Sequence, residues 1–362
     1  MKLADFKVEQ WMNKYEMDAH YNLTDTCMKS LTIQELLDME PLGSISLDYG
    51  QITGDKECKE AILSLYETGT TDQITTCHGC LEANQLVMET ILEPGDHVLA
   101  FVPGYQQFID MPRSLGCTVD TVSLDESKSW MPSITDVEQS LTENTRLIIL
   151  NNPNNPTGTL YTGAFLDALI KLCRKQGIYI LCDEVYRGLE ANESISDLYE
   201  RGIATSSLSK IYALAGLRFG WVKGPKEVID QINVRKDYTM VSTGPLIDAL
   251  ALTALKHKEE ILQRNRQILQ TNKETIRQWL ENEPRYHVQL PQEGTVCFLR
   301  YDFDIPSEQL ALELLEQTGI FFVPGSCFDC EYHLRLGLGQ DCQMTKEGLE
   351  RLSQWTDQRL GC

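Results

Sequence analysis

Positive charge is scarce in this chain. Its 362 residues include 32 Lys and Arg against 53 Asp and Glu, so the formal net charge is −21. Proteins that bind nucleic acid or anionic membrane surfaces contact phosphate groups with clustered Lys and Arg. An acidic surplus of this size argues against both kinds of partner, and the plainest role for the charge is to keep the protein soluble.

Long apolar runs are also absent. No stretch approaches the ~18 apolar residues that cross a bilayer. Residues 1–10 are polar and charged, where a secretory signal would have an apolar core. We therefore expect a cytoplasmic protein without a membrane segment. In that reducing compartment the twelve cysteines should be free thiols, many of them buried as small apolar side chains.

The cysteines are not spaced as the ligands of a metal site would be. Two CxxC pairs occur, Cys77/Cys80 and Cys327/Cys330, but they lie in unrelated segments. A four-thiolate zinc site normally takes its pairs from closer in the sequence. We expect no metal site, and nothing else in the sequence supports redox chemistry at these pairs.

Short apolar runs alternate with helical patterns through the middle of the chain. Residues 97–102, 146–150 and 178–182 are typical of buried strands, and apolar spacing predicts a helix over 164–176. Strands that alternate with helices predict an α/β fold with a mostly parallel, doubly wound sheet covered on both faces.

The pattern changes after residue 245. A long, charged helical stretch covers 246–283, and shorter elements after it predict a smaller α+β domain. The predicted elements of that domain are strands at 295–299 and 333–336 and helices at 307–317 and 345–360. We expect residues 1–45 to pack with this domain, 46–280 to form the large domain with the connecting helix, and 281–362 to form the small C-terminal domain.

Lys210 has the most informative surroundings in the chain. A hydroxyl lies three residues before it at Ser207, and a guanidinium lies eight residues after it at Arg218. An amine nucleophile beside two groups that bind anions suits an aldehyde cofactor that carries a phosphate, namely pyridoxal 5'-phosphate. Taken alone, a Ser-x-x-Lys is a weak signal, because most lysines are solvated surface charges.

Two of the predicted strands lead into polar residues. Asp183 follows the strand that ends at 182, and a buried carboxylate there needs a cation such as a protonated pyridine nitrogen. Tyr186 lies three residues further on, within reach of the phenolic oxygen of the same ring. Asn155 lies in an Asn/Pro-rich turn after residue 150, and ligands of open α/β sheets bind at such strand ends. The alternatives are an aspartate that caps the next helix and an ordinary turn.

Gly79 and Tyr105 occupy comparable positions. Gly79 lets backbone N–H groups approach a phosphate in front of a predicted helix at 84–92. Tyr105 follows the strand at 97–102, and its ring could stack on a flat cofactor, although a core or surface tyrosine is as common. Each signal is weak alone, but all share one type of position and one ligand, and such agreement is much stronger.

With these motifs the chain resembles the fold-type-I pyridoxal-phosphate enzymes, specifically the class I and II aminotransferases, from about Leu47 to the C-terminus. The resemblance implies an aspartate-aminotransferase-like large domain that binds the cofactor, with Lys210 as the Schiff-base lysine. It implies catalytic roles for Lys210, Asp183 and Tyr186, with Asp183 at the pyridine nitrogen. The other cofactor contacts that it implies in the same chain are Gly79, Cys80, Leu81, Tyr105, Asn155, Ser207 and Arg218.

The resemblance also implies a homodimer with shared active sites. Tyr49 matches a tyrosine that reaches the phosphate bound by the neighbouring subunit. Arg335 matches the arginine that binds the substrate α-carboxylate, a task that suits a guanidinium because it forms two parallel hydrogen bonds. Asn155 also lies on the substrate side in this family. Without the resemblance, a surface charge would be the simpler interpretation of Arg335.

Two features depart from the family pattern. Cys80 and then Leu81 stand where the phosphate turn often has alanine or a small hydroxyl residue. Residues 26–28 contain no glycine, although many members place one over the substrate.

The expected function is a pyridoxal-phosphate-dependent aminotransferase that moves an amino group between an amino acid and a 2-oxo acid. Within the family, the capreomycidine synthase-like and histidinol-phosphate aminotransferase-like branches are the most similar. A lyase, a decarboxylase or a cyclising enzyme of the capreomycidine synthase kind begins with the same covalent complex, so these alternatives stay open. A non-catalytic ligand-binding protein of the same fold is a distant alternative, because function follows from the site and this chain has no basic segment for DNA binding.

Overall fold

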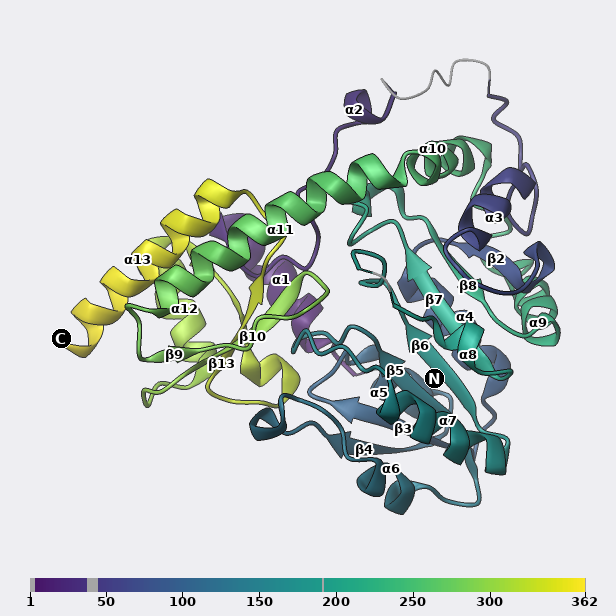
Figure 1. Cartoon of the computed structure of the whole chain (residues 1–362), viewed down its shortest axis with the longest axis horizontal. Coiled ribbons are helices and arrows are strands. Elements are labelled where there is room, and N and C mark those ends of the chain that lie inside the picture. Colours follow the sequence, from purple (N-terminus) through teal and green to yellow (C-terminus); the bar gives the residue numbers. More distant parts are fainter. Residues whose placement is uncertain (1–3, 38–44, 191, 362) are drawn as a thin grey trace.

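A seven-stranded sheet dominates the larger part of the computed structural model, which describes residues 4–37, 45–190 and 192–361 (Figure 1). The strand order is β2-β8-β7-β6-β5-β3-β4. Strands from β7 to β4 run parallel, and β8 runs antiparallel to both of its neighbours. The strands are β2 (Ile74–Cys77), β3 (His97–Val102), β4 (Thr118–Ser123), β5 (Thr145–Asn151), β6 (Tyr179–Asp183), β7 (Gly202–Ser207) and β8 (Gly220–Lys223). The expected mostly parallel sheet is confirmed.

Both faces of this sheet are buried, and successive residues of one strand belong to different cores. In β3, Val98 packs in the core formed with α4 (Cys80–Ile91), α5 (Gln107–Ser114) and α9 (Lys226–Lys236). Its neighbour Leu99 belongs to the core on the other face, which includes residues of α3 (Lys56–Leu63), α6 (Ile134–Ser140) and α7 (Ala164–Gln176). Burial on both faces explains why these strands are continuous apolar runs in the sequence.

α7 shows why the helix prediction over 164–176 is correct to the residue. Phe165, Leu169 and Cys173 recur at intervals of four and are buried against the sheet. The helix ends at Gly177, whose φ of 70° is left-handed and suits a residue without Cβ.

A four-stranded antiparallel sheet, in the order β12-β13-β10-β9, forms the smaller part. Its elements are β9 (Tyr286–His287), β10 (Val296–Tyr301), α12 (Ser307–Thr318), β11 (Ile320–Phe321), β12 (Val323–Pro324), β13 (His333–Gly337) and α13 (Cys342–Leu360). The two helices contribute buried residues such as Leu314 and Leu352 to its core. The expected smaller α+β domain is confirmed.

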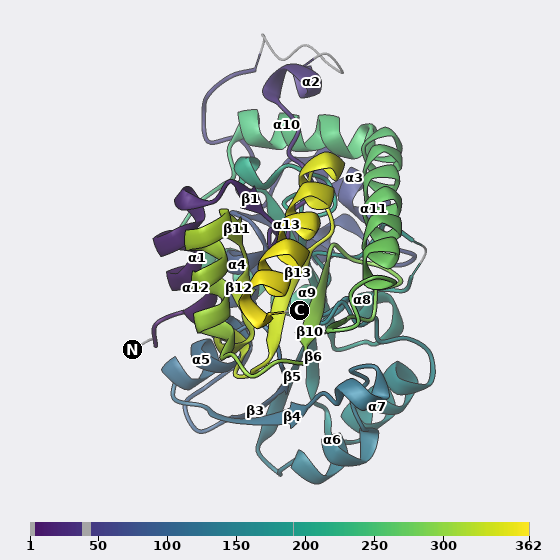
Figure 2. The ribbon, with the colours of Figure 1, turned by 90° about the vertical axis from the view of Figure 1, so that its left-hand side faces the viewer.

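The N-terminal segment packs on this smaller part. α1 (Lys7–Tyr15) lies beside the small sheet (Figure 2), where Trp11 Nε1 donates to Phe322 O at 2.8 Å. β1 (Tyr21–Asn22) pairs in parallel with β11. The domain boundaries at 45 and 280 remain predictions, and part of the first segment lies outside the described residues.

Residues 23–28 cross from the smaller part to the larger one. Gly337 N donates to Leu23 O at 2.7 Å and Gln340 Nε2 donates to Cys27 O at 2.9 Å, so the segment is bonded to β13 and the turn after it. Met28 N then donates to Lys210 O at 3.3 Å in the larger part. Lys29 N donates back to Gly339 O at 2.7 Å, so this segment is bonded to both parts.

The connector differs from its prediction. The stretch 246–283 is two helices, α10 (Pro245–Lys256) and α11 (Lys258–Leu280), separated at His257. His257 has a non-helical φ and ψ of −100° and 18°, and no Gly or Pro marks the break in the sequence. α11 then runs from the larger part to the smaller one (Figure 1).

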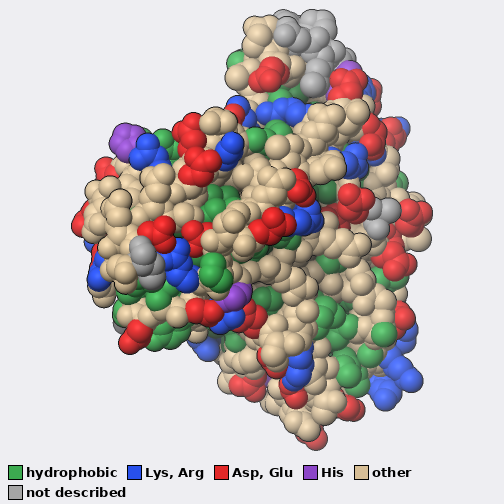
Figure 3. Space-filling view, turned by 60° about the vertical axis from the view of Figure 1, so that its left-hand side comes forward, with side chains coloured by type: hydrophobic (Ala, Val, Ile, Leu, Met, Phe, Trp, Pro, Cys, Tyr) green, Lys and Arg blue, Asp and Glu red, His purple; other side chains and the backbone are tan. Residues whose placement is uncertain are grey.

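The remaining described elements are short. They are α2 (Ile33–Leu37), α8 (Ile195–Leu198) and the 3-10 turns Glu16–Asp18, Thr71–Gln73, Glu126–Lys128, Ala215–Leu217 and Gly325–Phe328. Within the described ranges no helix is both long enough and apolar enough to cross a membrane. The face shown in Figure 3 mixes acidic and basic side chains and carries no broad basic patch.

Candidate active site

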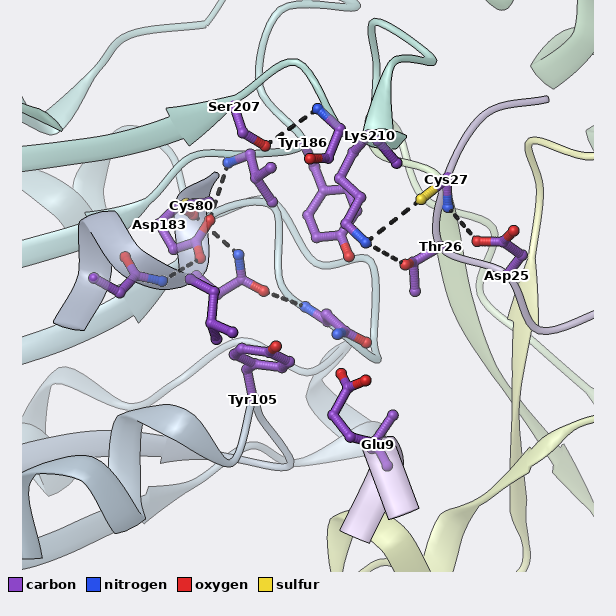
Figure 4. Close-up of a pocket in the computed structure, with 18 of the residues that line it drawn as sticks. Glu9, Asp25, Thr26, Cys27, Cys80, Tyr105, Asp183, Tyr186, Ser207 and Lys210 are labelled. Atoms are coloured by element: carbon purple, nitrogen blue, oxygen red, sulfur yellow. Dashed lines mark hydrogen bonds between the residues drawn. The ribbon is translucent and has the colours of Figure 1, made fainter. Parts of the chain in front are cut away.

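A cavity of about 420 Å³ lies at the carboxyl ends of the parallel strands, where the sequence places its polar motifs. β5 ends at Asn151 and β6 at Asp183, and these two residues are paired in register. Of the predicted site residues, the cavity is lined by Cys80, Leu81, Tyr105, Asn155, Asp183, Tyr186, Ser207, Lys210, Arg218 and Arg335. Figure 4 shows how several of these side chains converge.

Lys210 lies in the loop that follows β7, and its amine points into the cavity (Figure 4). Its Nζ donates to Thr26 Oγ1 at 2.6 Å and lies 3.7 Å from Cys27 Sγ. Burial by itself lowers the pKa of this amine, but the acidic groups around it, Cys27 first and Tyr186 next, outweigh burial and raise it. An amine attacks an aldehyde only in its neutral form, so Lys210 must be deprotonated when it reacts.

Asp183 is a buried carboxylate held by hydrogen bonds. It accepts from Asn84 Nδ2 at 2.8 Å and from Val185 N at 3.1 Å, and only 5% of its surface is exposed. Burial raises its pKa, and the two hydrogen bonds offset part of that rise. Within the described residues no Lys, Arg or His nitrogen comes within 4.0 Å of it. The alternative role as a helix cap is wrong, because turns follow Asp183 and the next helix begins at Ile195.

The Asn/Pro-rich turn after β5 is rigidly placed. Asn155 N donates to the side chain of Asn151 at 2.7 Å, and a Cβ added at Gly158 would lie 2.4 Å from Val296 O. Gly158 has a φ of 73°, so close approach and backbone conformation both require glycine there. The turn carries Asn155 to the cavity wall, so it is more than an ordinary surface turn.

Tyr186 and Tyr105 face the cavity from two sides (Figure 4). Tyr186 is 3% exposed, and burial raises the pKa of its phenol. Tyr105 also packs against Phe6 and Phe108, with ring centroids 5.0 and 5.6 Å away. Its ring is therefore held by aromatic neighbours, and it also lines the cavity, where a flat ligand could stack on it.

Gly79, Arg218 and Ser207 form a corner suited to an anion. α4 begins at Cys80, four residues earlier than predicted, so Gly79 stands directly at a helix N-terminus. A Cβ on Gly79 would lie 2.7 Å from Arg218 Nη2, and one on Gly220 would lie 2.6 Å from the backbone of Gly79. Both positions therefore require glycine. The corner brings together backbone N–H groups at the start of α4, the guanidinium of Arg218 and the buried hydroxyl of Ser207.

Arg335 reaches the cavity from β13 of the smaller part. It is 3% exposed, so its interpretation as a surface charge is wrong. Its Nε donates to Thr24 Oγ1 at 3.3 Å and its Nη1 to Asn155 Oδ1 at 3.5 Å. Burial lowers the pKa of this guanidinium, with Tyr186 and Asp25 acting against that effect. No carboxylate of the described residues comes within 4.0 Å, so a buried cation faces the cavity without an anion.

Two predicted residues do not line the cavity, Gly79, which adjoins Arg218, and Tyr49, which lies away from it. Tyr49 is 73% exposed, and its backbone oxygen accepts from Ser242 Oγ at 2.7 Å. Within one chain it contributes nothing to the site.

Several cavity residues have no local signal in the sequence. Glu9, Asp25, Thr26 and Cys27 arrive from the N-terminal segment, more than 180 residues before Lys210, and only the family resemblance placed residues 26–28 near the substrate. Asn84 could have been found, because it is a polar residue four positions after Cys80 on the buried face of an apolar helix. The further lining residues are Val8, Met12, Asn151, Val185, Ser209 and Ala215.

No group of three or more His, Cys, Asp or Glu in the described ranges is arranged to hold a metal ion. Cys77 and Cys80 are buried, and burial raises the pKa of the Cys77 thiol to about 12. The described cysteines are free thiols.

The cavity fits pyridoxal 5'-phosphate by the chemistry of its donors. Asp183 is a buried anion without a cation, which a protonated ring nitrogen would supply. The Lys210 amine can react with an aldehyde, and the corner at Gly79 and Arg218 would hold the phosphate. Each functional group of the cofactor thus finds a partner among residues already gathered here.

Comparisons with known proteins show the family, the fold and the cofactor. Residues 13–352 match the family model described as aminotransferase class I and II. A capreomycidine synthase from Streptomyces vinaceus is 25% identical over 360 residues, 96% of this chain and 92% of that protein. A crystal structure of a PLP-dependent aminotransferase from Streptococcus suis 89-1591 matches with a TM-score of 0.96 and 38% identity, over 99% of both chains. An aspartate aminotransferase structure from Thermotoga maritima matches with a TM-score of 0.82 and 24% identity, over 98% of this chain and 96% of that one.

Proposed function

Because this chain belongs to the aminotransferase class I and II family, it is a pyridoxal 5'-phosphate-dependent transferase, and we propose that it moves an amino group between an amino acid and a 2-oxo acid. The expected aspartate-aminotransferase-like fold and the expected cofactor are confirmed. One observation carries the proposal. The Lys210 amine lies in one cavity with a buried carboxylate that lacks a cation, Asp183, and a buried guanidinium that lacks an anion, Arg335.

When bound, pyridoxal 5'-phosphate supplies an aldehyde that links to amines and a ring that takes up electrons from the substrate α-carbon. Lys210 Nζ is the group that would hold it covalently and give way to the amine of the substrate. The freed Nζ would then take the proton from the substrate α-carbon and deliver it to the former aldehyde carbon of the cofactor. Thr26 Oγ1, 2.6 Å from Nζ, is placed to orient that amine.

Asp183 would pair with the ring nitrogen, which keeps the nitrogen protonated and the carboxylate ionised despite its burial. Asn155 and Tyr186 would hydrogen-bond the phenolic oxygen, and Tyr105 would stack on the ring. The phosphate would be held by Ser207, Arg218 and the turn Gly79, Cys80 and Leu81, where Cys80 and Leu81 contribute backbone N–H groups.

Arg335 would bind the substrate α-carboxylate. Its guanidinium is planar and buried, and two parallel hydrogen bonds to a carboxylate fix the orientation of the substrate as well as its position. Arg335 Nη1 also donates to Asn155 Oδ1, so the residue that would bind the α-carboxylate contacts the residue that would bind the phenolic oxygen. A substrate held by Arg335 would therefore be oriented with its α-proton toward Lys210.

We also propose a homodimer with shared active sites, in which Tyr49 serves the neighbouring cavity. In the isolated chain Leu47 and Tyr49 are 80% and 73% exposed, an unusual state for two large side chains so close in sequence. Mixing inactive Lys210→Ala with inactive Tyr49→Ala should restore activity, because one cavity of the mixed dimer keeps both residues. Failure of the mixture to regain activity, in a protein shown by light scattering to be dimeric, would contradict the shared site. A cytoplasmic location remains a prediction that cell fractionation would test.

One similarity supports a second class of reaction as the competing proposal. The capreomycidine synthase matches 96% of this chain, so a lyase, a decarboxylase or a cyclising enzyme on the same cofactor is the competing proposal. All of these begin with an amino acid held by Lys210 and Arg335, and they differ in which bond is broken next.

The cofactor spectrum separates these reactions. The purified protein with its cofactor is mixed with single amino acids. Conversion of the cofactor from its aldehyde to its amine form, reversed by a 2-oxo acid, supports transamination. Pyruvate and ammonia, carbon dioxide or a cyclic product without the amine form would favour the second class. Lys210→Ala should lose the covalent attachment, whereas Lys171→Ala, an exposed lysine on α7, should keep it. A native cofactor spectrum in Lys210→Ala would overturn the assignment.

A further inference from the structure

Two side chains of the N-terminal segment contact the amine at the centre of the proposed chemistry. Lys210 Nζ donates to Thr26 Oγ1 at 2.6 Å and to Cys27 Sγ at 3.7 Å (Figure 4). Within the described residues no other acceptor lies within hydrogen-bonding distance of Nζ, and no carboxylate oxygen comes within 4.0 Å. Both residues lie in the stretch 26–28, which lacks the glycine of many family members, so side chains are present where a glycine would offer none.

The backbone holds both acceptors in place. Thr26 is 8% exposed, and its carbonyl oxygen accepts from Thr295 Oγ1 at 2.5 Å. Met28 N donates to the carbonyl oxygen of Lys210 itself at 3.3 Å, and Cys27 lies between these two anchored residues. The lysine is therefore bonded to one short segment both at its backbone and at its amine. Acceptors fixed in this way need no rearrangement when the amine reacts.

These two contacts orient the neutral form of the amine. A neutral lysine amine has two N–H bonds and one lone pair on its nitrogen. When Thr26 and Cys27 accept the two N–H bonds, the lone pair takes the remaining direction, in which no described residue offers a hydrogen-bond partner. The lone pair attacks the aldehyde and accepts the α-proton, so its direction affects the rate of both steps.

We propose that Thr26 and Cys27 are positioning residues that set the direction of the lone pair of the neutral Lys210 amine. The inference rests on the proposed function for the role of Lys210. In the proton transfer the substrate Cα–H bond breaks, its proton forms a new bond to Nζ, and its electron pair passes to the cofactor ring. In cofactor attachment the lone pair bonds to the aldehyde carbon, and the aldehyde oxygen leaves as water with the two N–H hydrogens. Thr26 and Cys27 accept hydrogen bonds and exchange no proton in either step.

Cofactor attachment tests the orientation without any amino acid. Cofactor-free protein is mixed with pyridoxal 5'-phosphate, and absorbance follows formation of the covalent link. Thr26→Val removes the acceptor and keeps the shape of the side chain, so attachment should slow about ten- to a hundredfold. Cys27→Ala should slow it several-fold, because a thiol is a weak acceptor. Thr26→Ser keeps the hydroxyl and should retain most of the wild-type rate.

A double-mutant cycle separates this role from general structural support. In Lys210→Ala the cofactor binds without a covalent link, and adding Thr26→Val should leave its dissociation constant unchanged within about twofold. Thr345→Val is the matched control, since this buried threonine of α13 donates to Asp341 O at 3.1 Å and does not line the cavity. The control should lower the thermal midpoint and leave the attachment rate unchanged.

The proton transfer is tested with L-alanine that carries hydrogen or deuterium at its α-carbon. At saturating L-alanine, conversion of the cofactor to its amine form should slow in Thr26→Val and should be slower still with α-deuterium. 2-Methylalanine, which has no α-hydrogen, should bind the wild type and the variant with similar affinity. If L-alanine does not convert the cofactor, the amino acid that converts it fastest takes its place.

The outcomes separate this inference from the proposed function. An unchanged attachment rate in Thr26→Val, weaker cofactor binding when Thr26→Val is added to Lys210→Ala, or a slowed conversion that is insensitive to α-deuterium would each overturn the positioning role. Slower attachment in Thr26→Val, with no amine form of the cofactor from any amino acid, would support the positioning role and count against transamination. Transamination with an unchanged attachment rate in Thr26→Val would do the opposite.

Discussion

Replacing Asn84 by alanine should weaken the site without touching any reacting atom. Asn84 is fully buried, and its Nδ2 donates to Asp183 at 2.8 Å and to Gln107 Oε1 at 3.2 Å. Its Oδ1 accepts from Thr205 Oγ1 at 2.5 Å. Alanine removes all three contacts and leaves the Thr205 hydroxyl and one oxygen of Asp183 poorly bonded in the core.

The size of the effect follows from these contacts. A hydrogen bond to a charged group contributes about 1.5–3 kcal/mol, and a buried hydroxyl left unsatisfied costs about 1–3 kcal/mol. The variant should therefore be destabilised by about 2–4 kcal/mol, taking the two contributions as partly overlapping. If about 1.4 kcal/mol of this lost stabilisation also raises the free energy of the transition state, kcat/KM falls roughly tenfold.

The pH dependence should change in a defined direction. Loss of the Asn84 donor removes one of the bonds that offset burial, so the pKa of Asp183 should rise further. The proposed mechanism needs the ionised carboxylate of Asp183. Activity should therefore be lost at a higher pH on the acid side of the profile than in the wild-type enzyme, while the alkaline side stays in place.

The assay is the pH profile of kcat/KM together with the thermal midpoint of the cofactor-loaded protein. Asn233→Ala is the control, because Thr75 Oγ1 donates to Asn233 Oδ1 at 2.6 Å in the same type of contact away from the cavity. Both variants should lose stability, and only Asn84→Ala should move the acid limb. An acid limb that stays at its wild-type pH in Asn84→Ala would refute the reasoning.

Other substitutions test the remaining groups. Arg335→Lys should raise KM and lower kcat/KM by roughly ten- to a hundredfold, because one ammonium group cannot form the two parallel hydrogen bonds of a guanidinium. An unchanged KM would contradict the proposed role of Arg335. Gly79→Ala should weaken cofactor binding, since its Cβ would lie 2.7 Å from a guanidinium nitrogen. Gly163→Ala shares the positive φ but meets nothing within 4 Å, so equal cofactor loss in both would point to backbone strain alone. Without cofactor, burial raises the pKa of Asp183 above its ordinary value of 3.8. The folded protein therefore keeps the Asp183 proton at pH values where the unfolded chain has lost it. The free energy of unfolding should then fall as pH rises from 3.8 to the pKa of Asp183 in the folded protein. Asp183→Asn should flatten that part of the thermal-midpoint profile, and an unchanged slope would contradict it.

Most of the fold could be predicted because burial leaves a mark in the sequence. β3 and α7 appear at their predicted residues, since one is an apolar run and the other has apolar residues at helical spacing. β4 lacked that mark. It is an edge strand whose residues Thr118–Ser123 are mostly exposed, so its sequence resembles a loop.

The candidate site divides in the same way. Asp183, Asn155 and Lys210 follow strands, and strand ends can be located from a pattern. Thr26 and Cys27 reach the Lys210 amine across more than 180 residues of chain, and no local pattern encodes such an approach. Tyr49 is the reverse case, since the motif identifies it but a single chain leaves it on the surface.

Residues 24–29 couple the two parts of the molecule at the site. Thr26 O accepts from Thr295 and Thr24 Oγ1 accepts from Arg335 in the smaller part. Met28 N donates to Lys210 O in the larger part, and Lys29 N donates to Gly339 O in the smaller part. The arginine proposed to bind the substrate and the groups that touch the Lys210 amine therefore share one length of backbone. A movement of the smaller part relative to the larger one would displace Arg335 and the contacts of the amine together.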